Sequence, residues 1–477
     1  MTQRFHWAPL RRVAIVSAAV LVITIAFSLI KPSPRVVKAS DAKAPTLGDP
    51  IPKLTSVEQQ MFSQGNIVYI KTWDPRQGLG PIYTQDNCTN CHGSPIAGGG
   101  GGSLNNIDTI FATVDSTGQF DPMDGSDPND PTYPIGEGGV LQQPQSISAF
   151  VPTCKYNGEV IPTTPPFTVA ATLFEGRLAP PNFGMGLIDS IPAIQITNQA
   201  MSEQRNGVVF GQVNSVPDEY GTITDGKFGF KAQYATLTQF IGQAMTLEIG
   251  ITNPVNPTEQ LSNGVPIPKA CLNGDKTEPN DPNGTSMIDI FHYLLYLAPN
   301  QAAACTSNAC LDGQTQFSAV GCNNCHLTPS EGYTTGNRIE VPETYSKTGG
   351  PCDNGVKCLQ SKALSNQPVP LYSDLLLHDM GAGTSQSHLG DGFCSPQPVL
   401  AGDCPFGQAD GTQFRTTPLW GLSLRTLYLH DGRTNSLTTA IQDHAINGTG
   451  EAANIVAAFN GLTTQEQSDL ITFLNTL

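Results

Sequence analysis

Cys88-Thr89-Asn90-Cys91-His92 and Cys322-Asn323-Asn324-Cys325-His326 are two copies of the pattern C-x-x-C-H. This pattern is typical of c-type haem attachment. Two thiols, one helical turn apart, form thioethers with the vinyl groups of one porphyrin, and the adjacent histidine ligates the iron. A zinc knuckle or a thioredoxin-like redox pair also uses paired cysteines, but neither requires a histidine directly after the second cysteine, and neither explains the repeat. The sequence therefore predicts two covalently bound haems c.

The residues predicted to hold the haems follow from the motif itself. The thioether cysteines and proximal iron ligands are Cys88, Cys91 and His92 for haem 1, and Cys322, Cys325 and His326 for haem 2.

The composition predicts a loop-rich, mainly α protein. The 477 residues contain 48 Gly and 38 Pro, which is typical of irregular loops, while 39% hydrophobic residues are enough for real cores. Strand signals are few and short. We therefore expect two cytochrome c-like haem modules with extensive irregular loops and few short strands.

Helix signals place the boundaries of the expected parts. Capping boxes begin at Thr55 and Thr463, and apolar residues recur at helical spacing over 235–250 and 287–297. The last box opens an amphipathic C-terminal helix of the kind that closes a cytochrome c core. We predict residues 1–40 as a signal peptide or membrane anchor, 41–54 as a linker, 55–300 as the module of haem 1 and 301–477 as the module of haem 2.

The N-terminus has the pattern of an export signal. Arg4, Arg11 and Arg12 precede an uncharged apolar run over residues 13–30. This run is long for a signal peptide and just long enough to span a bilayer, so cleavage and retention both stay open. In either case we expect a periplasmic protein, soluble after cleavage or anchored to the inner membrane by residues 13–30, with membrane contact only through this segment.

The cysteines outside the two motifs suggest disulfides. Eight remain, an even number in a chain predicted to be exported. The plausible pairs are Cys305 with Cys310, Cys352 with Cys358, Cys394 with Cys404, and then Cys154 with Cys271. The connectivity is open on sequence alone, and the alternative of a second metal site has no supporting histidine spacing.

The net charge of −16 limits the partners. It argues against nucleic acid and anionic membrane surfaces, and it permits a small basic redox protein as electron donor or acceptor.

The histidines are distributed unevenly. None lies between His92 and His292, so a second ligand for haem 1 would be a methionine, a tyrosine or nothing. The methionine candidates are Met123, Met185, Met201 and Met245. The second module contains four further histidines, His378, His388, His430 and His444. We therefore expect an open or weakly ligated haem 1 and a bis-histidine haem 2, unless these histidines are surface or supporting groups.

Several segments together resemble the bacterial di-haem oxidoreductase family, which is distantly similar to di-haem cytochrome c peroxidases and to the methylamine dehydrogenase maturation enzyme. The resemblance runs from about residue 55 to the C-terminus. Besides the two motifs, it is carried by residues 78–81 (GLGP), 177–187 (RLAPPNFGMGL), 227–232 (KFGFKA), 248–252 (EIGIT), 375–381 (LLLHDMG), 415–421 (RTTPLWG), 429–433 (LHDGR) and 440–444 (AIQDH).

The resemblance implies further site residues. In the related peroxidases a Met or Tyr downstream of the His-Asp-Gly segment ligates the C-terminal haem, and His444 takes that place here. Those enzymes also place a glutamate near the N-terminal haem, and Glu248 matches best. A carboxylate in an apolar pocket has a raised pKa suited to moving a proton between peroxide oxygens. The alternatives are a surface histidine and an ordinary solvated helix glutamate.

Other implied roles are less specific. Trp420 is a candidate electron relay between the haems, with buried packing as the alternative. Arg415 and Arg433 are candidates to pair with haem propionates. Ca²⁺ between the haems is implied by the resemblance, although no EF-type spacing supports it. A histidine in place of the methionine ligand lowers the potential expected for haem 2.

Three classes of function are compatible with this reading. The leading one is a peroxidase-like oxidoreductase that passes electrons from haem 2 to an open haem 1, which reduces peroxide or oxidises a small-molecule substrate. The alternatives are a di-haem oxygenase or thiol/sulfur-compound oxidoreductase, and a non-catalytic electron-transfer cytochrome.

Overall fold

The computed structural model describes residues 45–114, 120–121, 141–161, 173–259, 267–274, 277–381, 409 and 412–477. The predicted signal or anchor at residues 1–40 and the start of the linker lie outside these residues, as do Met123, His388, Cys394 and Cys404. Within the described residues, no helix combines the length and hydropathy needed to cross a bilayer.

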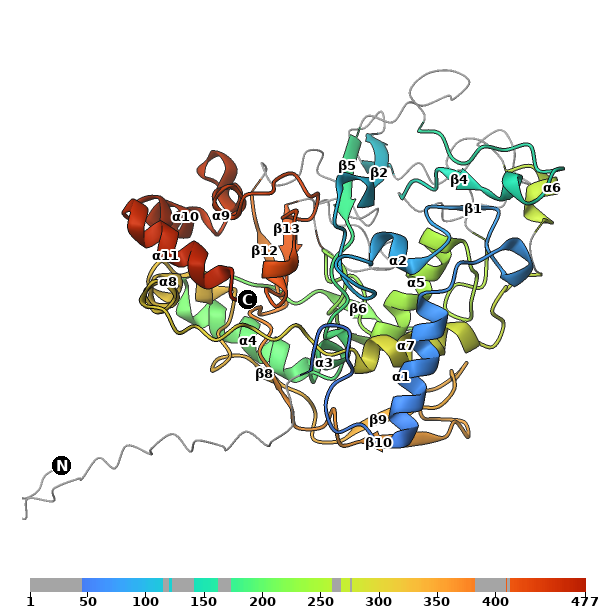
Figure 1. Ribbon diagram of the computed structural model, residues 1–477, viewed down its shortest axis with the longest axis horizontal. Helices are drawn as coiled ribbons and strands as arrows, with labels where there is room; N and C mark the ends of the chain where they lie inside the picture. The colour runs from blue at the N-terminus through green and yellow to red at the C-terminus, as the bar shows by residue number, and fades with distance from the viewer. Residues whose placement is uncertain are drawn as a thin grey trace, which may run out of the picture. The chain divides into compact units, whose positions relative to one another are not determined.

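Three helices carry the first half of the chain. The capping box at Thr55 is present, with both of its hydrogen bonds, and begins α1 (Ser56–Tyr69). The segments with helical spacing form α5 (Leu237–Ile249) and α7 (Thr285–Tyr296). Helix α7 packs against both α1 and α5, and the three run through one region in Figure 1. These sequence predictions are confirmed.

A second group of helices forms near the C-terminus. The capping box at Thr463 begins α11 (Thr464–Leu474), which packs against α8 (Asn308–Ala319). Helices α9 (Leu437–Gln442) and α10 (Ala453–Asn460) lie beside them in Figure 1. The remaining α-helices are α2 (Cys88–Cys91), α3 (Met185–Asp189), α4 (Ala193–Asn206) and α6 (Lys269–Leu272), and the 3₁₀ helices are η1 (Pro75–Gln77), η2 (Leu104–Asn106), η3 (Ile147–Ala149), η4 (Cys322–Asn324), η5 (Leu422–Leu424) and η6 (Asp443–Gly448).

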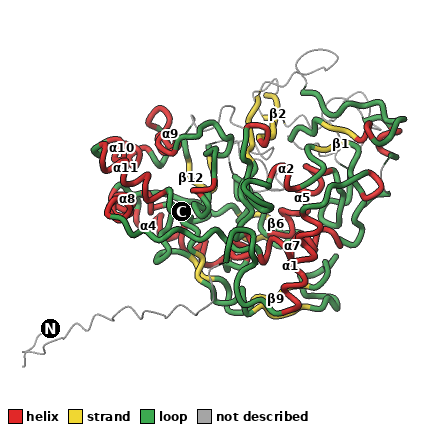
Figure 2. The backbone as a smooth tube through the Cα atoms, in the orientation of Figure 1, coloured by secondary structure: helices red, strands yellow, loops and turns green. Residues whose placement is uncertain are grey.

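The strands are short and pair mostly in twos, and long loops join the elements (Figure 2). The longest, β2 (Ile107–Val114), pairs antiparallel with β5 (Leu173–Leu178), and β12 (Leu377–Asp379) pairs with β13 (Gln413–Arg415). The others are β1 (Ile82–Tyr83), β3 (Phe120–Asp121), β4 (Gln145–Ser146), β6 (Ser215–Pro217), β7 (Ile223–Asp225), β8 (Tyr333–Thr334), β9 (Ile339–Pro342), β10 (Cys358–Ser361) and β11 (Pro368–Val369).

The described part of the chain forms one unit, whose buried apolar side chains gather mainly in two cores. The larger core combines α1, α5 and α7 with side chains from beyond residue 300, among them Leu364 and Leu371. The smaller core joins α8 and α11 through Phe317, Leu470 and Phe473. The larger core therefore draws on both sides of the predicted boundary at residue 300, and the division into two haem modules stays a prediction.

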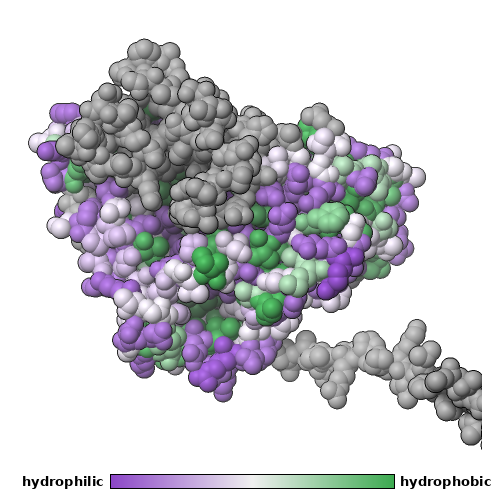
Figure 3. All heavy atoms as spheres, turned by 180° about the vertical axis from the view of Figure 1, so that it is seen from behind, coloured by the Kyte–Doolittle hydropathy of each residue, from purple (hydrophilic) through white to green (hydrophobic). Residues whose placement is uncertain are grey.

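Three of the four predicted cysteine pairs bring their sulfur atoms to bonding distance: Cys154 with Cys271, Cys305 with Cys310, and Cys352 with Cys358. The first ties the loop after η3 to α6. On the face seen in Figure 3, hydrophobic side chains form separate patches among hydrophilic ones, which is ordinary for a protein surface.

Candidate functional site

Each C-x-x-C-H motif opens onto its own cavity. The first cavity, of about 240 Å³, is lined by Cys88, Cys91 and His92. The second cavity, of about 260 Å³, is lined by Cys322, Cys325 and His326. Among the described cysteines, only these four motif residues have no disulfide partner. The thiols that the motif reserves for haem are therefore unpaired and face internal space.

Local capping shapes the first motif. Asn87 is the N-cap of α2, and its side-chain oxygen accepts a hydrogen bond from the Thr89 backbone N–H at 2.7 Å. The single turn that follows brings His92 back over Cys88, with a backbone hydrogen bond of 2.8 Å between them. One helical turn is the spacing that lets two thiols reach one ring.

The second motif uses a tighter turn. Helix η4 begins after Gly321, whose φ of +98° lies in the left-handed region that favours glycine. The His326 backbone N–H donates to the Cys322 carbonyl at 2.9 Å, as in the first motif.

Three histidines share one hydrogen-bond arrangement. The Nδ1 atoms of His92, His326 and His444 lie 2.9, 2.9 and 2.7 Å from the backbone carbonyls of Pro180, Tyr372 and Ala440. A carbonyl accepts, so Nδ1 carries the proton and Nε2 keeps its lone pair, which is the usual preparation of a metal-ligating histidine. Burial lowers the pKa of each ring, which favours the neutral, ligating form.

The rings of His326 and His444 are neighbours in the second cavity, in a T-shaped arrangement with centroids 6.4 Å apart and an interplanar angle of 65°. Imidazole–metal bonds are about 2.0–2.1 Å long and a ring nitrogen lies roughly 1.1 Å from its centroid, so two imidazoles on opposite sides of one ion have centroids roughly 6.3 Å apart. The residues of this cavity therefore fit a bis-histidine haem. The assignment of His444 as a ligand stays a prediction.

The other described histidines of the second module are less suited to ligation. Both ring nitrogens of His378 are engaged: Nε2 lies 2.9 Å from an Asp374 carboxylate oxygen and Nδ1 lies 3.0 Å from Glu451. His430 lines the second cavity but stacks on Phe414, with centroids 4.3 Å apart. Of the candidates in the described residues, His444 is the one whose ring contacts that of His326.

The first cavity has a different character. Among the described residues that line it, His92 is the only histidine, and carboxylates are present instead. Glu248, from α5, and Asp108, from β2, both line this cavity. Burial, and then the nearby charge of Asp108, raise the pKa of Glu248 to about 8, and burial raises the pKa of Asp108 to about 6. The first cavity therefore holds two carboxyl groups able to exchange protons near neutral pH.

The methionine candidates separate by position. Met185 and Met245 are buried and line the first cavity, together with Tyr69 and Tyr234. Met201 is half-exposed on α4 and does not line it. The first cavity is thus compatible with an open haem iron and also with a methionine or tyrosine ligand.

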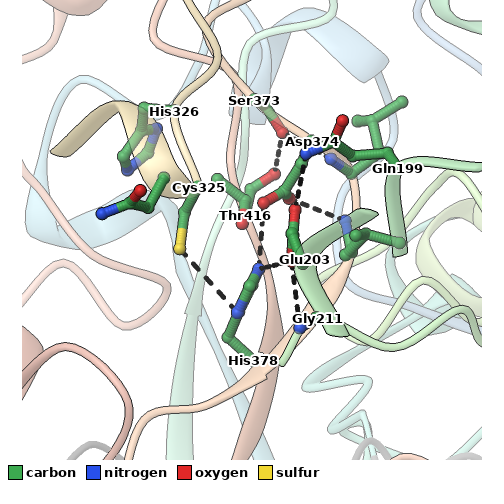
Figure 4. A network of polar contacts seen from close by, with 12 residues as sticks. Gln199, Glu203, Gly211, Cys325, His326, Ser373, Asp374, His378 and Thr416 are labelled. Atoms are coloured by element: carbon green, nitrogen blue, oxygen red, sulfur yellow. Dashed lines mark hydrogen bonds and ion pairs between the residues drawn. The ribbon is translucent and has the colours of Figure 1, made fainter. Parts of the chain in front are cut away.

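A buried polar network lies beside the second motif (Figure 4). His378 bridges Asp374 and Glu451, and its Nδ1 lies 3.8 Å from the Cys325 sulfur. Glu203 from α4 completes the group, with a carboxylate oxygen 3.9 Å from His378 Nε2. Burial disfavours the charged imidazole, but the neighbouring Asp374 carboxylate, and after it Cys325, outweigh burial and raise the pKa of His378 well above its ordinary value. These contacts favour the protonated imidazole of His378 beside the second motif.

Cys325, Asp374 and His378 are also the only trio of potential metal-ligating atoms within 4.8 Å of one another in the described residues. A thiol and an imidazole are not the oxygen ligands that Ca²⁺ requires. The implied Ca²⁺ site finds no support among these side chains and stays a prediction.

The remaining predicted residues also lie at the cavities. Trp420 is buried in the larger core and lines the first cavity, so both its packing and relay roles stay open. Arg433 lines the second cavity and pairs with Asp431 at 2.6 Å. Arg415 lines both cavities.

Sequence reasoning missed Asp108 and Arg425. Asp108 lies outside the segments that carry the family resemblance; β2 places it opposite Arg177 of β5 and in the first cavity. No local pattern marks it. Arg425 follows η5 and lines both cavities. The sequence signal that could have indicated Arg425 is its position four residues after the segment 415–421, which carries part of the family resemblance.

Each of the two cavities contains a C-x-x-C-H motif whose histidine has Nδ1 hydrogen-bonded and Nε2 free for a metal. This arrangement is that of a di-haem redox protein. A family described as "Di-haem oxidoreductase, putative peroxidase" matches residues 170–477, and the chain belongs to this family. The resemblance drawn from the sequence is confirmed. Family membership supports an oxidoreductase with haem cofactors.

Matches to individual proteins are more remote. No curated protein matches the chain. A structure of Kuenenia stuttgartiensis hydrazine synthase pressurized with 20 bar xenon matches at 18% identity and a TM-score of 0.27, covering 51% of this chain and 62% of that one. A MauG-like protein associated with microbial copper homeostasis matches at 15% identity and a TM-score of 0.27, covering 62% of this chain and 89% of that one. The chain thus spans less than two thirds of the hydrazine synthase chain.

Proposed function

We propose that this chain is an exported di-haem c-type oxidoreductase with peroxidase-like activity, in which electrons pass from haem 2 to an open haem 1. The observation that carries the proposal is the asymmetry of the two cavities. The second contains two imidazoles whose centroids are 6.4 Å apart, whereas the first contains carboxyl groups and, among its described lining residues, one histidine. Two strong ligands favour electron storage, and an open position favours catalysis.

The haem irons would supply the redox chemistry, and the chain's own residues would hold and support them. Cys88 and Cys91 would attach haem 1, with His92 as its proximal ligand. Cys322 and Cys325 would attach haem 2. The backbone carbonyls that accept from each Nδ1 keep the proximal rings in the tautomer that leaves Nε2 free for the iron.

Glu248 would move protons in the first cavity. Reduction of one peroxide to two waters takes up two electrons and two protons, and a carboxylate at the reacting oxygens can accept a proton from one oxygen and return it to the other. A group whose pKa is about 8 exchanges protons readily near neutral pH. Asp108, whose charge helps to raise that pKa, would tune Glu248 rather than contact peroxide.

Partners and location follow from the sequence and belong to the same proposal. The net charge of −16 suits a small basic redox protein as electron donor or acceptor. The basic and apolar N-terminal residues support a periplasmic location, with the protein soluble after cleavage or anchored through residues 13–30.

The test is EPR spectroscopy of the oxidised protein combined with an optical titration with H₂O₂. We expect one high-spin and one low-spin haem, with the high-spin signal consumed by peroxide. Two low-spin signals and no reaction with peroxide, even after half-reduction, would contradict the proposal and leave an electron-transfer cytochrome.

A di-haem oxygenase is the second candidate, because the first cavity is lined by many apolar side chains. Phe228, Phe240, Ile241, Ala244 and Met245 contribute to its wall. Such a wall suits an apolar organic substrate. Oxygen uptake that depends on an apolar substrate, without a fast reaction with peroxide, would favour this function over the first.

A further inference from the structure

Two arginines line both cavities. Arg415 ends β13, and Arg425 follows η5. Each contributes to the wall of the first cavity and to that of the second. The two guanidinium groups are close enough for the charge of Arg425 to lower the pKa of Arg415 further. They form a shared positive group, called here the arginine pair.

The arginine pair has no carboxylate partner among the described residues. Arg415 donates from Nε to the Gly229 carbonyl at 2.8 Å and from Nη1 to the Thr416 carbonyl at 3.2 Å. Arg425 donates from Nη2 to the Pro418 carbonyl at 2.8 Å, and its Nε is buried without a hydrogen-bond partner. The carboxylate whose charge acts on Arg415, that of Asp374, is occupied by His378.

This arrangement is unfavourable unless an anion completes it. Burial lowers the pKa of both guanidiniums to about 10, so they stay charged at neutral pH in surroundings poor in water. Two neighbouring, partly buried cations favour a counter-charge, and the buried Nε–H of Arg425, which has no partner, favours an acceptor. A guanidinium fork matches a carboxylate better than any other common anion apart from phosphate.

We propose that the arginine pair binds propionate carboxylates of both haems, so that the propionate edges of haem 1 and haem 2 meet at Arg415 and Arg425. The inference rests on haem occupying both cavities, as in the proposed function, and it adds where the two cofactors meet. The Nε atom of Arg425 is a buried donor left for a propionate oxygen. A single charged group shared by both haems would also set both reduction potentials.

Other cations at the cavities provide matched controls, because they line one cavity each. Arg177 and Lys227 line the first cavity, and Arg433 lines the second. A charge near one haem stabilises its reduced form, since reduction removes one positive charge from the iron. Removing a cation at one cavity is therefore expected to lower one potential, and removing a shared cation is expected to lower two.

The experiment is a spectroelectrochemical titration of the holoprotein, comparing wild type with Arg425→Gln, Arg433→Gln and Arg177→Gln. We expect Arg425→Gln to lower both midpoint potentials. The equilibrium constant for reduction of each haem should fall by roughly threefold to tenfold, which is about 30–60 mV, because a tenfold change corresponds to about 59 mV for one electron. Arg433→Gln should lower one potential and Arg177→Gln the other. A shift of one potential or of neither in Arg425→Gln would overturn the proposal.

Two additions keep the test decisive. A pyridine haemochrome assay of each sample counts the haems independently of potentials and of peroxide reactivity, so a failure of the di-haem function is recognised separately. If Arg425→Gln does not retain haem, Arg425→Lys replaces it. Lysine keeps the charge but loses the Nε donor and the fork, so both potentials should change together by a smaller amount; a change in one alone would again overturn the proposal.

Discussion

The rings of His326 and His444 lie with their centroids 6.4 Å apart, and the Nδ1 atom of each is held by a backbone carbonyl. His326 follows η4 and His444 lies in η6, so two separate segments contribute a histidine to the same cavity. Among the described residues that line the first cavity, His92 has no such histidine neighbour. This difference between otherwise similar motifs supports the proposal that one haem stores electrons and the other is catalytic.

The first prediction concerns His444. We expect His444→Met to keep haem 2 six-coordinate and to raise its potential by roughly 0.1 V or more, within the range of about 0.8 V that axial ligands span. EPR and a redox titration measure both properties. His430→Gln is the matched control, because His430 lines the same cavity but stacks on Phe414, and it should leave the low-spin signal intact. An unchanged spectrum and potential in His444→Met would exclude His444 as a ligand.

The second prediction concerns Glu248. Glu248→Gln removes the proton acceptor in the first cavity while keeping the side-chain shape, so the rate of reaction with H₂O₂ should fall by roughly 10²–10⁴. Haem content and potentials should change little. Stopped-flow absorbance measures the rate. Glu219→Gln provides the comparison, since burial raises the pKa of that carboxyl to about 7 but it lines neither cavity. Equal rates in wild type and Glu248→Gln would remove Glu248 from the mechanism.

The third prediction is a pH dependence. A base must be deprotonated to accept a proton, so the peroxide rate should rise with pH through the pKa of Glu248, about 8. Asp108→Asn removes a neighbouring negative charge, which lowers this pKa. In a plot of the peroxide rate against pH, recorded over roughly pH 6 to 9, the rise should therefore occur at lower pH in Asp108→Asn than in wild type. The rate at pH 7 should increase. A limb that stays in place or moves upward would show that Asp108 does not act on Glu248.

Sequence reasoning succeeded where the signal is local. The spacing within C-x-x-C-H and the capping boxes at Thr55 and Thr463 concern a few neighbouring residues, and the structure has the predicted turns and helices there. Glu248 and His444 were identified through the family resemblance, and each lies in the cavity of the expected motif.

Long-range pairing accounts for what the sequence did not indicate. Asp108 reaches the first cavity because β2 pairs with β5, a contact between distant segments with no local pattern. Arg425 lines both cavities, and this shared position arises only when distant segments fold together. The sequence around Arg425 therefore did not indicate it. His378 was a reasonable ligand candidate by residue type, yet Asp374 and Glu451 occupy both of its nitrogens.

The fourth prediction separates the two attachment sites. The double variant Cys88→Ser, Cys91→Ser should lose one covalent haem, and Cys322→Ser, Cys325→Ser should lose the other. Intact mass and the pyridine haemochrome assay should each report half of the wild-type haem. The control variant Cys352→Ser, Cys358→Ser removes a predicted disulfide whose cysteines line neither cavity, and it should retain two haems. Retention of two covalent haems in either motif variant would contradict c-type attachment there.

The last prediction concerns Asp374, whose carboxylate is fully buried against His378. Asp374→Asn leaves a buried imidazolium with less counter-charge, and breaking such a pair costs roughly 3–5 kcal/mol. The pKa of His378 is raised in the folded protein, so its stabilisation is complete below the ordinary value of 6.5 and is lost as pH rises through the folded pKa. The loss of melting temperature should therefore be largest below about pH 6.5 and smaller in alkaline buffer.

Thermal unfolding of the holoprotein followed by circular dichroism measures this difference at several pH values. Asp74→Asn is the matched control, because Asp74 pairs with Arg76 on the surface and should leave the melting temperature unchanged. A melting temperature lowered equally at all pH values would mean that Asp374 acts by packing and not through the charge of His378. An unchanged melting temperature would mean that Glu451 alone suffices to hold the imidazolium.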